Sequence, residues 1–548
     1  MSEDERKNKF REKQKQEQGA ERKRRTKVGQ FNAPAKPPPP TEFIQKLSKE
    51  GLDKFIEQAL QHKQHDQIAI LDLSRLKFSE LSPRVKFYMR MLRDVKVLNL
   101  YSNKLRKLPA EIGEMKGLVS LGINENHIQE IPAEIGKLTN LEMLDLRYNR
   151  LTALPEEIGD CTALTKLFIR WNRIKKLPDG VGKLANLRVL AARHNKLTEV
   201  TPAVNDLANL EVLDLQHNKI ESLPPLGKLQ KLEVLDVEYN QLTSLPEDLK
   251  ELTQLQRFHA RYNLIPEMPA SMLSAMTKLI EFDMEGNRLK SIPPEIGSLR
   301  RLKNLYLSRN QISELPSGIG KLTRLEELHL NENLLANVEQ LIPLKSLSIL
   351  DLGNNLLEDL PAGFVQLTAL KDLFLASNKI SVLMPEIGEM SSLIHIDMND
   401  NKLKLLPPEI GNLSHLRVLN LEGNDIRKLP NELGKLSALQ KLLLGFNNLT
   451  HLTPEIGLLT NIKELNLDEN RLRCLPREIG KCMSLEVLSF NENDINDLPN
   501  ELYLLDQLRL FGMDDNPLEA IPAQVAEGGS QEVFNFLGER LQKRQQKG

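Results

Sequence analysis

Pairs of an arginine followed by an aromatic ring recur along the chain and are its strongest candidates for chemistry. Guanidinium groups and aromatic rings are enriched among the side chains that dominate protein–protein binding energies. The chemistry they predict is therefore partner binding, on a surface where cations lie beside flat rings. The alternative is that each arginine stacks on a ring as an ordinary solvated residue. The pairs are Arg147-Tyr148, Arg170-Trp171, Arg193-His194 and Arg261-Tyr262, with Tyr239 at an equivalent ring position.

The charge balance at the equivalent repeat positions changes from basic to acidic along the chain. Between Leu141 and Lys278 basic residues are in slight excess at these positions, whereas acidic residues clearly outnumber basic ones from Glu281 onward. A spacing such as that of Asp397 and Asp400 could hold a cation weakly, but a solvated acidic wall is the simpler interpretation, and we expect no metal site. The acidic candidates for a second partner surface are Glu285, Asp397, Asp400, Asp468 and Glu469.

The sequence contains no catalytic or cofactor-binding signature. It has no GxxxxGK[ST] phosphate-binding loop, and no Cys/His spacing typical of a zinc site. We therefore expect neither an enzyme nor a bound cofactor. Five histidines, His194, His217, His259, His329 and His395, are predicted to line the same face singly.

Composition argues against a nucleic-acid-binding, a membrane-spanning or a secreted protein. The net charge of −1 gives no general attraction to nucleic acid, and no apolar run approaches the roughly 18 residues that span a bilayer. The chain begins MSEDERKNKF, without an apolar signal core, and its three cysteines are too few for disulfide-bonded caps. These features favour a cytoplasmic, monomeric protein, with nuclear import through the basic run from Arg22 to Lys27 as an alternative.

The element that must position these side chains is a repeat of 23 residues with the pattern LxxLxLxxNxLxxLPxxIGxLxx. A fixed period of this length predicts a solenoid in which neighbouring coils bury a shared core. The period slips by one residue near Asn240, Asn287 and Asn355. The repeating asparagines are Asn103, Asn126, Asn149, Asn172, Asn195, Asn218, Asn240, Asn263, Asn287, Asn310, Asn333, Asn355, Asn378, Asn401, Asn424, Asn447, Asn470, Asn493 and Asn516.

One repeat, Leu141 to Ala163, shows the expected local structure. Residues 143–147 alternate in polarity, as expected for a short parallel strand with one buried face. Asn149 follows where the chain turns inward, and its amide can satisfy backbone groups of two adjacent coils. We therefore interpret the asparagine ladder as structural, and the polar strand positions as a concave binding surface.

The chain divides into four predicted segments. Residues 1–40 are charged and poor in apolar side chains, which predicts a disordered tail. Residues 41–67 have apolar residues at helical spacing and predict a helical N-terminal cap. Residues 68–527 form the solenoid, with an irregular or helical insert at 82–94, and residues 528–548 predict a C-terminal capping helix and tail.

The repeat resembles that of the Ras-group intracellular leucine-rich-repeat proteins. The similarity extends through LYSNKL and LPAEIG between Leu100 and Gly113, FIRWNRI at Phe168 to Ile174, and the ending LEAIPAQVAEGGSQEVFNFL. It implies an α/β horseshoe with about 20 short parallel strands on the concave face, irregular or 3-10 convex turns, and helical caps at both ends.

The resemblance also implies a non-catalytic scaffold. Within that group, one scaffold binds a GTP-loaded Ras-type small GTPase and a protein phosphatase 1 catalytic subunit, which then acts on Raf-type kinases. By position, the GTPase would face Arg147, Arg170, Arg193 and Arg261 with Tyr148, Trp171 and Tyr262. An adaptor for an unrelated intracellular protein is the alternative.

Two short motifs are candidates for docking the phosphatase. Arg84-Val85-Lys86-Phe87 matches the RVxF pattern, which adds to the phosphatase as an extended strand. Val28 and Phe31 form a similar pair, one residue too widely spaced, within the charged tail where docking motifs usually lie.

Overall fold

The computed structural model describes residues 44–46, 69–81 and 83–545. The basic run from Arg22 to Lys27, the candidate docking residues Val28 and Phe31, and most of the expected N-terminal cap lie outside the described residues. Within the described part, no helix is long and apolar enough to cross a membrane.

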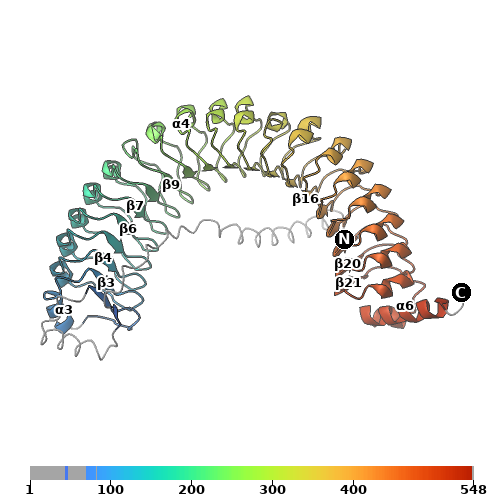
Figure 1. The fold of residues 1–548 in the computed structure, drawn as a ribbon, viewed down its shortest axis with the longest axis horizontal. Coiled ribbons are helices and arrows are strands. Elements are labelled where there is room, and N and C mark those ends of the chain that lie inside the picture. Colours follow the sequence, from blue (N-terminus) through green and yellow to red (C-terminus); the bar gives the residue numbers. More distant parts are fainter. Residues whose placement is uncertain (1–43, 47–68, 82, 546–548) are drawn as a thin grey trace.

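The described chain forms an open horseshoe whose inner edge is lined by strands and whose outer edge carries short helical turns (Figure 1). Within the described residues, a single sheet contains 21 strands of three residues each. Each strand pairs in parallel with its sequence neighbours, and Leu144 of one repeat aligns with Leu167 of the next. The predicted solenoid of about 20 parallel strands is thus confirmed.

The strands follow the period of the sequence. They are β1 (Ile44–Lys46), β2 (Ile70–Asp72), β3 (Val97–Asn99), β4 (Ser120–Gly122), β5 (Met143–Asp145), β6 (Lys166–Phe168), β7 (Val189–Ala191), β8 (Val212–Asp214), β9 (Val234–Asp236), β10 (Arg257–His259), β11 (Glu281–Asp283), β12 (Asn304–Tyr306), β13 (Glu327–His329), β14 (Ile349–Asp351), β15 (Asp372–Phe374), β16 (His395–Asp397), β17 (Val418–Asn420), β18 (Lys441–Leu443), β19 (Glu464–Asn466), β20 (Val487–Ser489) and β21 (Leu510–Gly512).

The convex side consists mainly of 3-10 turns, and the described residues also contain four α-helices, of which the last lies at the end of the solenoid (Figure 1). The 3-10 turns are η2 (Ala110–Glu114), η3 (Ala133–Lys137), η4 (Glu156–Asp160), η5 (Asp179–Lys183), η6 (Pro202–Asp206), η7 (Glu247–Glu251), η8 (Pro294–Ser298), η9 (Ser317–Lys321), η10 (Glu339–Leu341), η11 (Ala362–Gln366), η12 (Pro385–Glu389), η13 (Pro408–Asn412), η14 (Asn431–Lys435), η15 (Pro454–Leu458), η16 (Arg477–Lys481) and η17 (Asn500–Leu504). The α-helices are α3 (Pro83–Met89), α4 (Ala270–Ala275), α5 (Ala523–Glu527) and α6 (Ser530–Gln545).

The slips in the period change only the convex side. The repeat that ends at Asn287 is one residue longer than its neighbours and forms the α-helix α4 instead of a 3-10 turn. The repeat that ends at Asn355 is one residue shorter, and its turn η10 has three residues instead of five. The strands stay in register because the added or missing residue is absorbed where no ladder hydrogen bond depends on it.

Glycine permits the close stacking of the convex turns. A side chain at Gly136 would place its Cβ 2.6 Å from the carbonyl oxygen of Glu157 in the next coil. No real Cβ approaches an oxygen this closely, so the Ile-Gly pair of the repeat is a packing requirement.

The asparagine ladder has the predicted structural role. Asn149 Nδ2 donates to the carbonyl oxygens of Ile123, at 2.9 Å, and Leu146, at 3.1 Å. Its Oδ1 accepts the amide of Ile128 at 3.0 Å. One side chain therefore satisfies three buried backbone groups of two coils, while leucines such as Leu144 fill the core with no exposed surface.

The two ends of the solenoid differ. At the N-terminal end the expected helix is wrong at Ile44–Lys46, because these residues form strand β1 and pair with β2. A strand there satisfies the backbone groups of the first coil, which a helix could not do. At the other end α6 covers the last coil with Val533 and Leu537 fully buried. Arg540 anchors it through two hydrogen bonds to Asp497, at 2.7 and 2.9 Å.

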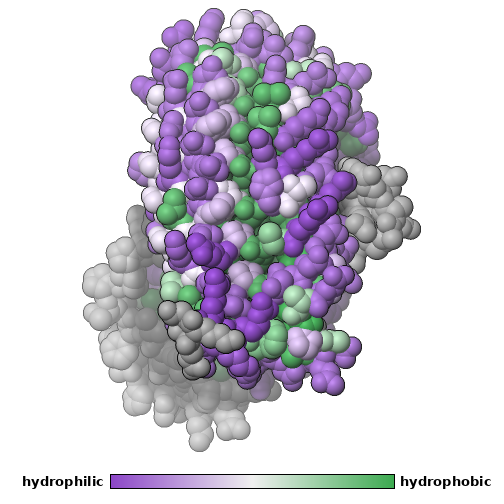
Figure 2. All heavy atoms as spheres, turned by 90° about the vertical axis from the view of Figure 1, so that its right-hand side faces the viewer, coloured by the Kyte–Doolittle hydropathy of each residue, from purple (hydrophilic) through white to green (hydrophobic). Residues whose placement is uncertain are grey.

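The outer surface is mostly polar. Figure 2 views the molecule from the side of the C-terminal limb, where charged and polar side chains cover most of the surface and a narrow line of apolar ones follows the stacked coils. Leu458 and Met483 are among the exposed apolar side chains of this limb. The solenoid therefore presents separate outer and inner surfaces, and the sequence candidates lie on the inner one.

Candidate protein-binding site

Six rings from six consecutive coils form one continuous stack, which we call the ring stack. Adjacent ring centroids are 3.7 to 5.7 Å apart and the planes lie within 18° of parallel. The two rings at its N-terminal end are also the most exposed, with 50% of Tyr148 and 43% of Trp171 accessible. The members are Tyr148, Trp171, His194, His217, Tyr239 and Tyr262.

The six ring residues have an unusual backbone conformation. All six have φ between +51° and +59°, the left-handed region that bulky residues rarely adopt. The same conformation occurs before every ladder asparagine, because the inward turn that places the asparagine requires it. The ring stack thus follows from a left-handed turn repeated in every coil, which places successive rings 3.7 to 5.7 Å apart.

The ring stack ends at Gly286. This residue occupies the next ladder position with φ +67°, and a Cβ there would lie 2.7 Å from a ring carbon of Tyr262. Glycine both relieves the left-handed strain and leaves room for the last ring. We call the coils of β5 to β10, which carry the rings, the ring arc, and those of β11 to β21 the acidic arc.

Two of the four predicted arginines are held by internal ion pairs. Arg147 donates from Nε to Oδ1 of Asp145 at 2.8 Å and from Nη2 to Oδ2 at 2.5 Å. Arg261 Nε lies 2.9 Å from Oε2 of Glu238, in an orientation outside hydrogen-bond geometry. Arg261 also stacks over Tyr239, 5.5 Å from its centroid. The expectation that all four guanidinium groups are open to a partner is therefore wrong for these two, because acidic neighbours on the same face compensate them.

Arg170 and Arg193 are less compensated. Arg193 Nε approaches Asp214 Oδ2 only to 3.9 Å, and neither Arg193 Nε nor Arg170 Nε has a hydrogen-bond partner in the described structure. Arg170 has no ion pair with any described residue and lies 5.9 Å from the centroid of Phe168. Burial, followed by the charges of Arg193 and Arg147, lowers the pKa of Arg170. The arc therefore holds a local excess of positive charge beside Trp171.

Buried carboxylates lie in or next to the coils that carry the ring stack, and their surroundings favour the protonated form. Burial and the neighbouring Asp236 raise the pKa of Asp214 to about 7 and that of Glu238 to about 8. Burial likewise raises the pKa of Asp283 to about 6. In the ring stack, burial and then the charges of His217 and Arg193 lower the pKa of His194 to about 4, so this ring is neutral near pH 7.

The predicted acidic residues do not form one cluster. Glu285 accepts from the hydroxyl of Tyr262 at 3.0 Å and thereby joins the end of the ring stack. Asp397 ends β16, and Asp400 follows before the next ladder asparagine. Asp468 and Glu469 lie three coils further, where Asp468 accepts from Ser489 and Asn491. These side chains form a row along the acidic arc.

The candidate docking motif at Arg84 to Phe87 is not extended. Val85 and Phe87 both belong to helix α3, and the side chain of Phe87 is 56% exposed. Residues two apart on a helix point in different directions, whereas an added strand needs them on one face. This segment therefore does not have the conformation that the motif requires.

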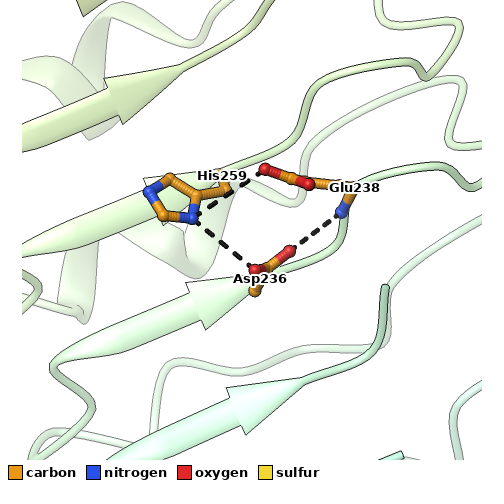
Figure 3. A group of neighbouring side chains, drawn as sticks. All are labelled: Asp236, Glu238 and His259. Atoms are coloured by element: carbon orange, nitrogen blue, oxygen red, sulfur yellow. Dashed lines mark hydrogen bonds and ion pairs between the residues drawn. The ribbon is translucent and has the colours of Figure 1, made fainter. Parts of the chain in front are cut away.

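The expectation that the histidines line the concave face singly is wrong in two places. His217 stacks on His194 and Tyr239 within the ring stack, as its position just before Asn218 could have indicated. Asp236, Glu238 and His259 converge from two neighbouring coils (Figure 3). The feature of the sequence that could have revealed this group is the alignment of neighbouring repeats, which places Asp236 beside His259.

Comparisons with known proteins agree with this architecture. A family model described as a leucine-rich repeat region matches residues 56–167, 120–218 and 399–515, about half of the chain in total. A model described as two copies of leucine-rich repeats matches residues 208–251 and 300–343, and one described as a leucine rich repeat matches residues 323–380. A search of curated proteins finds no match.

Several solved structures are similar. A leucine-rich-repeat protein of Leptospira interrogans is 30% identical with a TM-score of 0.54, covering 85% of this chain and 100% of its own. The Arabidopsis receptor kinase HAESA, solved with the peptide hormone IDA and the co-receptor SERK1, is 25% identical with a TM-score of 0.61, covering 82% of this chain and 83% of its own.

A third similar structure is the ectodomain of the Arabidopsis thaliana receptor kinase GASSHO1/SCHENGEN3, solved with CASPARIAN STRIP INTEGRITY FACTOR 2. It is 25% identical with a TM-score of 0.59, and the match covers 83% of this chain and 62% of that ectodomain. Leucine-rich repeats are typically protein-interaction domains and not enzymes. The repeat, its asparagine ladder and these matches together show that the chain belongs to the leucine-rich-repeat family.

Proposed function

We propose that the chain is a non-catalytic scaffold whose ring arc binds a folded protein with an acidic surface. The observation that carries this proposal is Arg170, a cation without an ion pair among the described residues, next to the exposed ring of Trp171. An anionic group on a partner would compensate the charge that the chain itself leaves open. Trp171 supplies flat apolar area at little entropic cost, as hot-spot residues do.

The partner that best fits this surface is a Ras-type small GTPase in its GTP-loaded state. The support is the resemblance to the Ras-group repeat proteins together with the position of Arg170 and Arg193 beside the ring stack. In this proposal Arg147 and Arg261 have a different role, because their ion pairs hold the surface in shape. The acidic arc would take a second protein, and the assembly would act on Raf-type kinases in the cytoplasm.

A charge-reversal series tests the GTPase-binding surface. Arg170→Glu and Arg193→Glu are each expected to weaken binding of the GTP-loaded GTPase by on the order of 2 kcal/mol, roughly 30-fold. Lys441→Glu makes the same charge change in the acidic arc and should leave this affinity within about twofold. Titration calorimetry at two salt concentrations measures all three. Unchanged binding in both arginine variants would reject the site.

Nucleotide dependence separates this proposal from its alternative, a leucine-rich-repeat adaptor for an unrelated intracellular protein. A scaffold of Ras-type signalling should capture the GTP-loaded form and not the GDP-loaded form. An adaptor of another kind has no reason to distinguish them. Equal capture of both forms by the immobilised chain would favour the adaptor.

Recruitment of a protein phosphatase 1 catalytic subunit is a further part of the proposal. Because Val85 and Phe87 are helical, we assign docking to Val28 and Phe31. Replacing Val28 and Phe31 together by Ala should abolish co-purification of the phosphatase. Replacing Val85 and Phe87 together by Ala is the matched control and should leave it intact. The reverse result would require α3 to unwind on binding.

A further inference from the structure

We propose that Asp236, Glu238 and His259 form a binding site for a single divalent transition-metal cation on the floor of the ring arc. One donor atom from each side chain lies within 4.8 Å of the other two. Two carboxylates and one imidazole make a mixed oxygen and nitrogen set that suits Zn²⁺ or a similar ion and leaves a coordination position open. Its residues have no recognised ligand spacing, and only the alignment of neighbouring repeats places Asp236 beside His259.

The geometry directs one atom of each side chain into a common space (Figure 3). His259 Nδ1 lies 3.6 Å from Asp236 Oδ2 and 4.0 Å from Glu238 Oε1. These separations exceed hydrogen-bond lengths. Two ligand atoms that each lie about 2.0 to 2.2 Å from one cation are roughly 3.3 to 4.4 Å apart, so both separations fit a shared cation.

Charged or polar groups lie against the outward atoms of all three ligands. His259 Nε2 faces Oε1 of Glu281 at 3.3 Å, outside hydrogen-bond geometry, so a cation at Nδ1 would leave the Nε2 proton directed toward a carboxylate. Glu238 Oε2 lies 2.9 Å from Arg261 Nε, as an ion pair. Asp236 Oδ1 accepts the backbone amide of Glu238 at 3.3 Å. A carboxylate behind a ligating histidine is the usual outer partner of metal sites.

The charge of Asp236 depends on His259 for compensation. Its side chain is only 9% exposed, and no lysine or arginine among the described residues lies within 4 Å of its carboxylate. Although burial opposes protonation, the carboxylates of Asp236 and Glu281 raise the pKa of His259, and Gln216 Nε2 is a neutral donor to Oδ2. A carboxylate removed from water needs a compensating charge, and a metal ion that replaced the Nδ1 proton of His259 would provide it.

The site lies on the same coils as the ring stack. Asp236 ends β9, Glu238 directly precedes Tyr239, and His259 ends β10. A cation bound here would face the concavity with its open coordination position. An anionic group of a bound protein could fill that position, but the metal site stands without any partner.

Cobalt binding tests the site in the full chain without reference to any partner. After treatment with a chelator, the chain should bind one equivalent of Co²⁺ with visible absorption bands of a low-coordinate nitrogen–oxygen site, and Zn²⁺ should displace it. His259→Gln should abolish the bands and weaken Zn²⁺ binding at least tenfold. Glu281→Gln, which alters only the outer partner, should weaken it by roughly 10- to 100-fold.

His329→Gln is the matched control. His329 is also a concave histidine beside a carboxylate, with Nδ1 3.7 Å from Asp351 Oδ2, but it does not belong to the group of three. This variant should keep the Co²⁺ bands, and circular dichroism should show that every variant is folded. Absent bands in the unmodified chain, or bands retained in a folded His259→Gln protein, would overturn the proposal.

Discussion

The ring arc and the acidic arc share the same backbone conformation and differ in the side chain that precedes each ladder asparagine. In both arcs, the residue before the ladder asparagine adopts positive φ. In the ring arc that residue is an aromatic ring in six consecutive coils, and the rings stack. In the acidic arc the same position carries residues such as Arg309, Glu332 and Asp400, which form no continuous stack. The scaffold is therefore uniform, and its recognition chemistry is local.

The arcs also differ in how they compensate charge. In the ring arc, arginines such as Arg147 and Arg261 pair with almost buried carboxylates. In the acidic arc, side chains such as Glu464 pair with the more exposed Lys441. Buried pairs depend on both partners, whereas exposed pairs contribute little. The ring arc is therefore the more sensitive surface to single substitutions.

The largest expected effect tests whether the scaffold is uniform. Asn172→Ala in the ring arc and Asn424→Ala in the acidic arc each remove three short hydrogen bonds, of 2.9 to 3.0 Å, to buried backbone groups. Each should lower the free energy of unfolding by about 3 kcal/mol, at about 1 kcal/mol per bond. Urea unfolding followed by circular dichroism measures both. A much greater loss for Asn172→Ala would show that the rings add to the stability of the ladder.

A second pair of variants tests the positive-φ position. Gly286 and Gly423 both have φ +67°, so an alanine is strained at either by about 1 to 2 kcal/mol. Gly286→Ala should also move Tyr262 and change the near-ultraviolet circular dichroism of the ring stack. Gly423→Ala, whose Cβ would meet Asp400, should leave that signal unchanged. Identical spectra for both variants would show that the stack does not depend on Gly286.

The third comparison concerns charge compensation. Arg147→Ala leaves Asp145, whose side chain is 10% exposed, without its cation, and should cost about 1 to 2 kcal/mol. Lys441→Ala breaks a pair in which the lysine is 51% exposed, and should cost at most about 0.5 kcal/mol. Thermal unfolding of the two variants at low salt measures the difference. Equal costs would mean that burial does not distinguish the arcs.

The smallest effect is a pH dependence of the ring stack. The pKa of His194 is lowered to about 4, so protonation of this ring favours the unfolded chain. Its contribution to stability is complete above about pH 6.5 and is lost as the pH falls toward 4. Fluorescence of Trp171, whose centroid is 3.7 Å from that of His194, reports the change. His194→Gln should flatten this dependence, whereas His395→Gln in the acidic arc should not.

The period of the sequence was sufficient to predict the parallel sheet, the buried leucines and the asparagine ladder. Each of these depends on spacing within one coil and on contacts between adjacent identical coils, so a single repeat specifies them. The exposed ring of Trp171 could be predicted for the same reason. The C-terminal capping helix could be predicted from a different signal, the helical spacing of apolar residues after the last repeat. The prediction was wrong at β1, because the pairing of the first coil with a preceding segment leaves no repeat in the sequence.

The solenoid, its ladder and the line of rings all follow from regular spacing in the sequence. The ion pairs of Arg147 and Arg261, the absence of one at Arg170 among the described residues, and the meeting of Asp236 and Glu238 with His259 became visible in the folded chain. Those outcomes depend on side chains of different coils packed across the concave face. Their distances and burial are set by the curvature and stacking of the assembled sheet, which no single repeat encodes.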